Sequence, residues 1–338
     1  MTGMERFAYE LIRELDKTAR SAALDMRLVV PTNARNVPEL HNIRVVRYGK
    51  ARGSLWEQIF MTAYCLRHNA MSLSLRPIMP LLKPGIVCIH DVSYKTNPSF
   101  FATPYSRLAR WWVLYHFWAA KHFSPIVFTV SEWSKREIMD EYGIEGERIV
   151  VLGNGWEHFK RVKADETLAA RHPEWIQRPF FFSLGSLAPN KNIKWIVDVA
   201  RRHRQYNFLI GGNASLRAYG TDYREEQYAN VKFIGYLSDE EVKYLMSRCK
   251  AFLFPSVYEG FGLPPLEALS VGAPIVVSNA SCLPEIYGDS AHYIDPYDTN
   301  VDLDRLLEEP VSPANKLLEK YSFARYARIV ADTLGKMP

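Results

Sequence analysis

The sequence predicts an α/β fold with two domains, each built on a parallel β-sheet that helices cover on both faces. The chain has 338 residues, too many for one ordinary hydrophobic core and suited to two domains of roughly 150 residues. Short, continuously apolar runs alternate with amphipathic stretches, which is typical of buried parallel strands joined by helices. Hydrophobic residues make up 48% and charged residues 23% of the chain, as in globular proteins.

Runs rich in β-branched and aromatic residues predict the strands. They lie at 26–30, 43–47, 86–90, 127–130, 149–152, 180–184, 207–210, 231–234, 251–254, 275–277 and 291–294. Segments with helical periodicity predict the helices. They lie at 5–17, 55–67, 105–122, 132–142, 193–204, 239–247, 265–270, 302–308 and 324–334.

A polar segment at 160–178 separates two complete α/β alternations, and Pro179 ends it. We therefore predict an N-terminal domain at 1–165, a C-terminal domain at 166–320, and a last segment at 321–338 whose helix returns to the first domain. The chain opens on a Gly3 turn and a helix, whereas a doubly wound domain usually begins with a strand leading into such a turn. The N-terminal domain is accordingly expected to lack its first strand.

Composition excludes several classes of protein. The four cysteines form no C-x-x-C pair, so we expect buried free thiols. Residues 1–17 lack the apolar core of a secretory signal, and no apolar run reaches the length of a membrane span, so a cytoplasmic protein is expected. The net charge of +5 suits phosphate-bearing substrates or contact with anionic lipid, but it is too sparse for nucleic-acid binding.

The sharpest motif is Glu259-Gly-Phe-Gly-Leu-Pro-Pro-Leu-Glu267, which follows an apolar strand and runs into a helix. The glycines, Gly260 and Gly262, allow close approach of a ligand, and backbone amides at a helix N-terminus attract phosphate. We expect the amides of Phe261, Gly262 and Leu263 to cradle a phosphate, Glu267 to accept hydrogen bonds from a ribose diol, and Glu259 to face a sugar. A strand–turn–helix link with a capping carboxylate is the structural alternative.

This segment resembles the paired-glutamate motif of the family-four glycosyltransferases, group-one glycosyl transferases that are retaining enzymes with the GT-B fold. Other segments extend the resemblance over most of the chain. They are Gly3-Met-Glu-Arg-Phe7, His90-Asp91, Thr129-Val-Ser-Glu-Trp-Ser134, Asn154-Gly155 and the loop from Gly185 to Lys191-Asn192. The resemblance implies two Rossmann-like domains that face each other across a cleft.

The resemblance also implies residue roles. Glu267 would hold the donor ribose, Glu259 the transferred sugar, and Lys191 the diphosphate, a role that suits its point charge. His90, at the end of a strand where ligands bind in α/β sheets, would contact donor sugar or acceptor. The remaining candidates divide into a donor group and a cleft group. The donor group is Gly3, Arg6, Gly185, Ser186, Asn192, Gly260, Phe261, Gly262 and Leu263, and the cleft group is Asp91, Ser131 and Asn154.

The sequence departs from the family where arginines commonly stand. Ser186 follows Gly185, and Asn190 precedes Lys191, so the lysine has less help against a diphosphate. Arg6 is our candidate for the second cation.

No cofactor or metal is expected beyond the nucleotide-sugar donor itself. Asp302-Leu-Asp304 has the D-x-D form of metal-dependent transferases, but it lies at the start of a predicted helix, where acidic residues favour the helix dipole. We interpret it as a helix cap.

The segment 107–122 has two interpretations. Helical periodicity gathers Arg107, Arg110, Trp111, Leu114, Trp118 and Lys121 on one face. A basic, tryptophan-rich face is typical of a helix lying at the inner surface of an anionic membrane. The second interpretation is a core helix, in which the aliphatic stems of the arginines cover apolar surface.

The resemblance implies a nucleotide-sugar-dependent, metal-independent hexosyltransferase. It would move a hexose or deoxyhexose of rhamnose, mannose, galactose or glucose type, with retention, to a saccharide or lipid-linked saccharide in bacterial surface polysaccharide biosynthesis, such as lipopolysaccharide or capsule. The alternatives are a catalytically impaired GT-B protein that binds nucleotide sugar, and a GT-B nucleotide-sugar epimerase.

Overall fold

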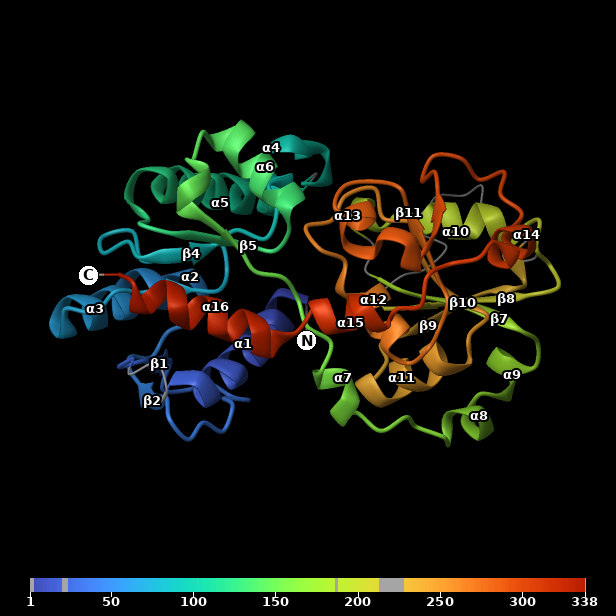
Figure 1. The fold of residues 1–338 in the computed structure, drawn as a ribbon, viewed down its shortest axis with the longest axis horizontal. Coiled ribbons are helices and arrows are strands. Elements are labelled where there is room, and N and C mark those ends of the chain that lie inside the picture. Colours follow the sequence, from blue (N-terminus) through green and yellow to red (C-terminus); the bar gives the residue numbers. More distant parts are fainter. Residues whose placement is uncertain (1–2, 20–23, 102, 186–187, 213–227, 338) are drawn as a thin grey trace. The chain divides into compact units, whose positions relative to one another are not determined.

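The computed structural model describes residues 3–19, 24–101, 103–185, 188–212 and 228–337. The chain forms two compact units (Figure 1): unit 1 contains Met1–Gly155 and Tyr321–Pro338, and unit 2 contains Trp156–Lys320. The last helix thus belongs to the same unit as the N-terminal residues. The first boundary lies ahead of the predicted position at 165/166, because Lys243 Nζ donates to the carbonyls of Phe159 and Val162, both at 2.8 Å, and holds this segment in unit 2.

Unit 2 is a doubly wound domain around a six-stranded, wholly parallel sheet with the order β12-β11-β10-β7-β8-β9. The strands are β7 (Phe180–Leu184), β8 (Asn207–Gly211), β9 (Val231–Gly235), β10 (Ala251–Phe254), β11 (Ile275–Ser278) and β12 (His292–Ile294). The described α-helices are α7 (His158–Arg161), α8 (Leu168–Arg171), α9 (Pro173–Ile176), α10 (Ile193–Ala200), α11 (Asp239–Arg248), α12 (Leu263–Ser270), α13 (Leu283–Tyr287), α14 (Leu303–Glu308) and α15 (Asn315–Lys320).

Unit 1 holds two parallel sheets among its described residues, one with the order β1-β2 and one with the order β3-β4-β5-β6. The strands are β1 (Arg27–Val30), β2 (Arg44–Arg47), β3 (Leu73–Ser74), β4 (Ile86–Cys88), β5 (Val127–Thr129) and β6 (Ile149–Val151). The helices are α1 (Gly3–Ala19), α2 (Gly53–Trp56), the π-helix η1 (Glu57–Met61), α3 (Thr62–His68), α4 (Ser93–Thr96), α5 (Pro104–Phe123), α6 (Glu132–Tyr142) and α16 (Phe323–Gly335).

Every strand predicted from the sequence is present, with ends that shift by a residue or two. The sequence missed β3, which has two residues and so shows no periodicity. The predicted helix at 193–204 ends earlier, at Ala200, because the chain must turn before β8 begins at Asn207. Asp302 caps α14, as predicted: its Oδ1 accepts from the amides of Asp304 and Arg305 at 3.1 and 3.2 Å.

Helices α1 and α16 lie side by side in unit 1 although they come from opposite ends of the chain (Figure 1). The ring of Phe7 on α1 lies 6.4 Å from that of Phe323 on α16, and meets the imidazole of His90 edge-on at 4.9 Å. At the other end of α1, buried Asp16 accepts hydrogen bonds from the amides that lead into β2, including that of Ile43 at 2.7 Å. Helix α1 therefore joins the two sheets of unit 1.

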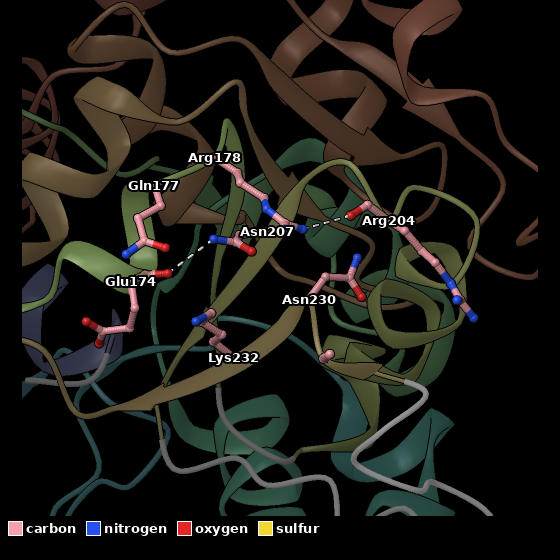
Figure 2. Close-up of a pocket in the computed structure, with 8 residues that line it drawn as sticks. Glu174, Gln177, Arg178, Arg204, Asn207, Asn230 and Lys232 are labelled. Carbon is pink, nitrogen blue, oxygen red and sulfur yellow. Dashed lines mark hydrogen bonds between the residues drawn. The ribbon is translucent and has the colours of Figure 1, made fainter.

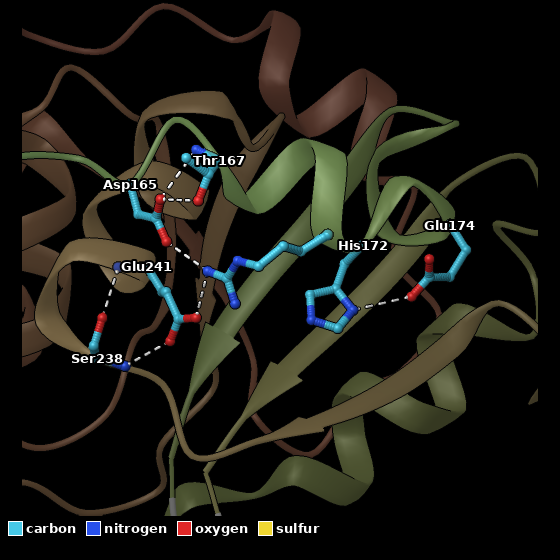
Figure 3. A network of polar contacts seen from close by, with 7 residues as sticks. Asp165, Thr167, His172, Glu174, Ser238 and Glu241 are labelled. Carbon is cyan, nitrogen blue, oxygen red and sulfur yellow. Dashed lines mark hydrogen bonds and ion pairs between the residues drawn. The ribbon is translucent and has the colours of Figure 1, made fainter.

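The first segment of unit 2 along the chain is held by hydrogen bonds near the amino ends of its strands. Asn207, the first residue of β8, donates to the carbonyl of Glu174 at 3.3 Å (Figure 2). It also donates to the carbonyl of Trp175 at 3.0 Å. The guanidinium of Arg171 donates to Asp165 at 2.5 Å and to Glu241 on α11 at 2.9 Å. Figure 3 labels these two acidic partners. These contacts order a polar segment that has little apolar surface to bury.

Each unit buries two cysteines, as expected: Cys65 and Cys88 in unit 1, and Cys249 and Cys282 in unit 2. Burial raises the pKa of all four thiols, that of Cys249 to about 12. The negative charge of Glu259 raises the pKa of Cys282 further.

The buried His116 on α5 makes unit 1 sensitive to acid. Burial lowers its pKa to about 4, and its Nδ1 accepts from the amide of Met79 at 3.3 Å. The unfolded chain takes up this proton near pH 6.5, so stability is full above that pH and falls as the pH drops from 6.5 to 4, by about 3 kcal/mol.

We predict that in His116→Asn, which keeps an acceptor for the Met79 amide, the free energy of unfolding falls less steeply as the pH drops from 6.5 to 4. Urea unfolding followed by tryptophan fluorescence between pH 4 and 7 measures it. His122→Asn, at an exposed position of the same helix, should keep the wild-type slope. Equal slopes in wild type and His116→Asn would contradict the assignment.

Candidate functional site

The site in unit 2 is built on the loops that follow β7 and β10, two neighbouring parallel strands whose carboxyl ends share one edge of the sheet. Asn190 joins the loops, because its Nδ2 donates to the carbonyl of Tyr258 at 3.1 Å and its carbonyl accepts from Val257 at 2.8 Å. Asn192, in the left-handed region at φ 49°, donates to the carbonyls of Pro255 and Pro296 at 3.2 and 2.7 Å. These asparagines position the lysine between them.

That lysine, Lys191, forms an ion pair with the first glutamate of the motif. Its Nζ lies 2.6 Å from Oε1 of Glu259 and 5.2 Å from the centroid of the Phe254 ring. The side chains of Lys191 and Glu259 are 24% and 12% exposed, so a ligand can reach both. The structure brings together two residues that are 68 positions apart and that the sequence predicts in one site.

The Gly262 turn starts α12. Gly262 has a φ of 83°, and a Cβ there would lie 2.7 Å from Cδ2 of Leu283 and 3.3 Å from the Phe254 ring. The hydroxyl of Tyr287 donates to the carbonyl of Gly262. Pro264 and Pro265 occupy the first turn, where a missing N–H costs no helical hydrogen bond. The turn therefore needs glycine for its backbone conformation and for its packing.

The second glutamate, Glu267, is held by a histidine that the sequence analysis missed. Nε2 of His158, at the start of α7, lies 2.7 Å from Oε1 of Glu267, and the two side chains are 2% and 9% exposed. His158 fixes the carboxylate and occupies one of its oxygens. Nothing in the sequence indicates this pair, because 109 positions separate its members and no motif contains His158.

The loop after β7 brings two backbone segments into close contact. The amide of Gly185 donates to the carbonyl of Gly211 at 3.1 Å, and a Cβ on Gly212 would lie 2.1 Å from the carbonyl oxygen of Gly185. Gly212, which the sequence analysis did not select, is required by this approach. Ser186, predicted to bind donor, lies outside the described residues.

In unit 1 the predicted residues follow three neighbouring strands. His90 follows β4, Ser131 follows β5 and Asn154 follows β6, so all three lie at the carboxyl edge of one sheet. Burial lowers the pKa of His90, and its Nε2 donates to the carbonyl of Leu75 at 3.0 Å. The imidazole is therefore neutral, with an acceptor lone pair on Nδ1.

The other unit 1 candidates have visible structural roles. Asp91 accepts from the amide of Ser93 at 2.9 Å. Ser131 caps α6 by accepting from the amide of Ser134 at 3.0 Å. Gly3 begins α1, and Arg6 lies in its first turns. Their predicted contacts with donor or acceptor stay predictions.

A pocket of about 310 Å³ lies elsewhere in unit 2, between Arg178, Arg204 and Lys232 (Figure 2). It opens at the amino ends of β8 and β9, whereas the predicted residues lie at the carboxyl ends. Among the described residues no three histidine, cysteine or acidic side chains are placed to hold a metal ion.

Comparison with known proteins agrees with this geometry. Residues 165–322 match the family model for Glycosyl transferases group 1. O-antigen chain mannosyltransferase B of Escherichia coli is 25% identical over 89% of this chain and 84% of its own length. O-antigen chain mannosyltransferase RfbU of Salmonella typhimurium is 27% identical over 76% of this chain and 71% of its own.

The C-terminal half of the chain thus matches the group 1 glycosyl transferases. Solved structures show that this glycosyltransferase has the GT-B fold. Anabaena HepE in complex with UDP-glucose aligns over 97% of this chain and 96% of its own, with a TM-score of 0.69 and 16% identity. WaaG, a glycosyltransferase involved in lipopolysaccharide biosynthesis, aligns over 98% of this chain and 92% of its own, with a TM-score of 0.62 and 15% identity.

We predict that Gly262→Ala destabilises the enzyme more than Gly272→Ala. Both glycines have φ near 80°, but a Cβ at Gly272 meets nothing within 4 Å. Gly272→Ala should therefore cost about 1 kcal/mol of backbone strain, and Gly262→Ala about 1–3 kcal/mol more for its clash with Leu283. The difference is measured in urea unfolding, and equal losses would show that packing does not constrain Gly262.

Proposed function

We propose that this glycosyltransferase transfers a hexosyl residue, of mannose type, from a nucleotide-sugar donor to a saccharide or lipid-linked saccharide in bacterial surface polysaccharide biosynthesis. The observation that carries the proposal is the accessible Lys191–Glu259 pair beside the Gly262 turn, at the carboxyl edge of a parallel sheet. The names of the two O-antigen mannosyltransferases support the choice of mannose and of the pathway.

In the proposed donor complex, Lys191 contacts the diphosphate. Its ammonium charge, together with the amides at the start of α12, stabilises the departing nucleoside diphosphate, so no metal is needed for that charge. Glu267 uses the oxygen that His158 does not hold to accept from the ribose diol. The pairing with His158 keeps this carboxylate in one orientation before the donor arrives.

The proposed chemistry retains the anomeric configuration. The acceptor hydroxyl attacks the anomeric carbon on the face from which the phosphate leaves, the carbon–oxygen bond to the diphosphate breaks, and the proton passes to a phosphate oxygen. Glu259 lies 2.6 Å from Lys191 before the donor binds; when the diphosphate takes Lys191, Glu259 orients and stabilises the sugar, and the phosphate oxygen rather than Glu259 serves as the base. In unit 1, Nδ1 of His90 accepts a hydrogen bond from a sugar or acceptor hydroxyl.

We predict that Lys191→Ala weakens binding of the nucleoside diphosphate about 10- to 100-fold, since it removes charge-assisted hydrogen bonds. Turnover should fall at least about 100-fold, because Lys191 would donate hydrogen bonds to the negative charge that develops on the departing diphosphate. Lys194→Ala is the matched control, because Lys194 is exposed on the following helix and pairs with Asp198 at 2.6 Å.

Titration with GDP, UDP and dTDP, with and without EDTA, measures binding, and transfer of labelled mannose from GDP-mannose to a lipid-linked saccharide extract measures turnover. EDTA should leave both unchanged. Near-normal turnover in Lys191→Ala would refute the assigned role. Donor binding without any turnover in the wild type would favour a protein that only binds nucleotide sugar.

We further propose that α5 contacts an anionic membrane, where a lipid-linked acceptor is held. None of the helices in the described ranges is long and apolar enough to cross a bilayer. Large side chains are exposed at helical spacing along α5: Leu108 by 70%, Trp111 by 65%, Tyr115 by 48%, Trp118 by 46% and Phe123 by 56%. We call this set the α5 face.

The α5 face differs in part from the predicted one. Arg110 donates to the carbonyl of Tyr94 at 2.5 Å and Leu114 is half-buried, so Leu108 and Tyr115 take their places. Arg107 and His122 remain exposed beside it. Nε1 of Trp112 donates to Ser54 at 3.2 Å, which places α2 and its exposed Leu55 next to α5. This arrangement suits insertion at a lipid headgroup layer.

We predict that Trp111→Glu combined with Trp118→Glu weakens binding to vesicles of phosphatidylglycerol and phosphatidylcholine about tenfold or more, because two large apolar side chains lose their burial in lipid. Sedimentation with the vesicles measures it. Tyr236→Glu, at a 78% exposed aromatic of unit 2, is the control. Unchanged binding in the double variant would exclude the α5 face.

A further inference from the structure

The pocket of about 310 Å³ in unit 2 lies at the amino ends of β8 and β9, the sheet edge opposite to the Lys191–Glu259 pair (Figure 2). Its volume is at the small end of the range for ligand pockets. The lining comes from the segment around α9 and from residues at the starts of the two strands. Because β8 and β9 are neighbours in the parallel sheet, the side chains at their starts lie close together.

Asn207, the first residue of β8, uses only one end of its side-chain amide. It is 5% exposed, and its Nδ2 donates to the carbonyls of Glu174 and Trp175. These two acceptors fix which end of the amide faces α9. Oδ1 accepts no hydrogen bond from any described residue, and Figure 2 shows it directed away from Glu174. A buried acceptor without a donor is unfavourable, so this oxygen needs a donor from the pocket that Asn207 lines.

Asn230, just ahead of β9, repeats this arrangement. It is 7% exposed, and its Nδ2 donates to the carbonyls of Ala200, His203 and Tyr206 at 3.0, 3.3 and 3.1 Å. Its Oδ1, like that of Asn207, has no donor among the residues that the structure describes. The pocket is thus lined by two buried asparagines whose oxygens can both accept from hydroxyl groups.

The same pocket carries positive charge. Arg178 and Lys232 line it, and neither forms an ion pair within the described part of the chain. Nη1 of Arg178 lies 3.5 Å from the carbonyl of Arg204, whose own side chain leads away from Lys232 (Figure 2). The carboxylate of Glu174, which also lines the pocket, lies 3.4 Å from Nδ1 of His172 (Figure 3). Two cations therefore remain for an anionic ligand.

These groups select a class of ligand. The asparagine oxygens need several hydroxyl donors, and Arg178 and Lys232 need an anionic group. No aromatic side chain on which a nucleobase could stack is found among the described lining residues. A hydrocarbon chain supplies neither hydroxyls nor charge. A sugar that carries an acidic group supplies both.

We propose that this pocket is a second saccharide site, which binds one hexose unit that carries a phosphate or a carboxylate. Its hydroxyls donate to Oδ1 of Asn207 and of Asn230, and its acidic group contacts Arg178 and Lys232. The site lies at the amino ends of the strands, whereas the proposed donor site lies at their carboxyl ends. Binding here does not depend on the proposed transferase activity, so the two proposals can fail independently.

The test is isothermal titration of the full-length protein with mannose 6-phosphate and with glucuronate. Saturating GDP and UDP are present, so that the proposed donor site is occupied. The variant is Arg178→Gln combined with Lys232→Gln, which leaves the hydrogen bonds of both asparagines in place. Lys316→Gln, at an exposed lysine of α15, is the matched control. Thermal unfolding confirms that both variants are folded.

We expect the double variant to bind both compounds about tenfold or more weakly, because it loses charge-assisted hydrogen bonds, and Lys316→Gln to bind as the wild type does. Mannose, which lacks the charge, and inorganic phosphate, which lacks the sugar hydroxyls, should each bind at least about tenfold more weakly than mannose 6-phosphate.

Equal affinities of the wild type and the double variant would overturn the proposal. So would inorganic phosphate that binds as tightly as mannose 6-phosphate, since the pocket would then recognise charge alone. Displacement of mannose 6-phosphate by GDP or UDP would assign the binding to the donor site, and no binding of either compound would leave the pocket to water. A phosphodiester of two hexoses distinguishes the sources of the ligand: a residue of a polysaccharide if it binds as mannose 6-phosphate does, and a free sugar phosphate if it does not.

Discussion

The sheets of this glycosyltransferase are wholly parallel, and that one constraint shapes both its site and its interior. Parallel strands place all their carboxyl ends on the same edge, so residues far apart in sequence converge there without any long-range motif. In unit 2 this brings Lys191, from the loop after β7, to Glu259, from the loop after β10. In unit 1 the same arrangement places His90, Ser131 and Asn154, which follow β4, β5 and β6, at the carboxyl edge of one sheet.

In the proposed donor site, the charged side chains are paired before any ligand binds. Lys191 is neutralised by Glu259, and Glu267 is held by His158, so neither carboxylate faces the site as an isolated buried charge. A diphosphate that approaches Lys191 competes with Glu259 for its ammonium group. In the proposed donor complex Glu259 would then turn toward the sugar, so donor binding itself would place this carboxylate. The cost of separating the pair is offset by the greater charge of the diphosphate.

The parts of this architecture that depend on local pattern could be predicted from the sequence. Continuous apolar runs located the strands of both units, and the glycines and prolines of 259–267 located the turn that starts α12. What could not be predicted depends on contacts between distant segments. His158 has no local signal for its partner Glu267, and Gly212 is needed only because Gly185 approaches it.

The position of the domain boundary also depends on contacts between distant segments. The polar composition of 160–178 suggested a domain boundary within it, yet Arg171 contacts Glu241 on α11, and Lys243 on α11 holds the carbonyls of Phe159 and Val162, so the segment belongs to unit 2. The exposed face of α5 differs in part from the predicted one for a similar reason, since the contact of Arg110 with Tyr94 could not be predicted from helical periodicity. The roles of the donor and cleft residues rest on the resemblance and on their place at the sheet edge.

The buried cysteines give each half of the molecule its own chemical marker. A thiol must ionise to react with most alkylating reagents, and burial keeps all four protonated at neutral pH. Alkylation therefore becomes fast only where the surrounding core opens. Because Cys65 and Cys88 belong to unit 1 while Cys249 and Cys282 belong to unit 2, the peptides that carry the label identify which core opened first.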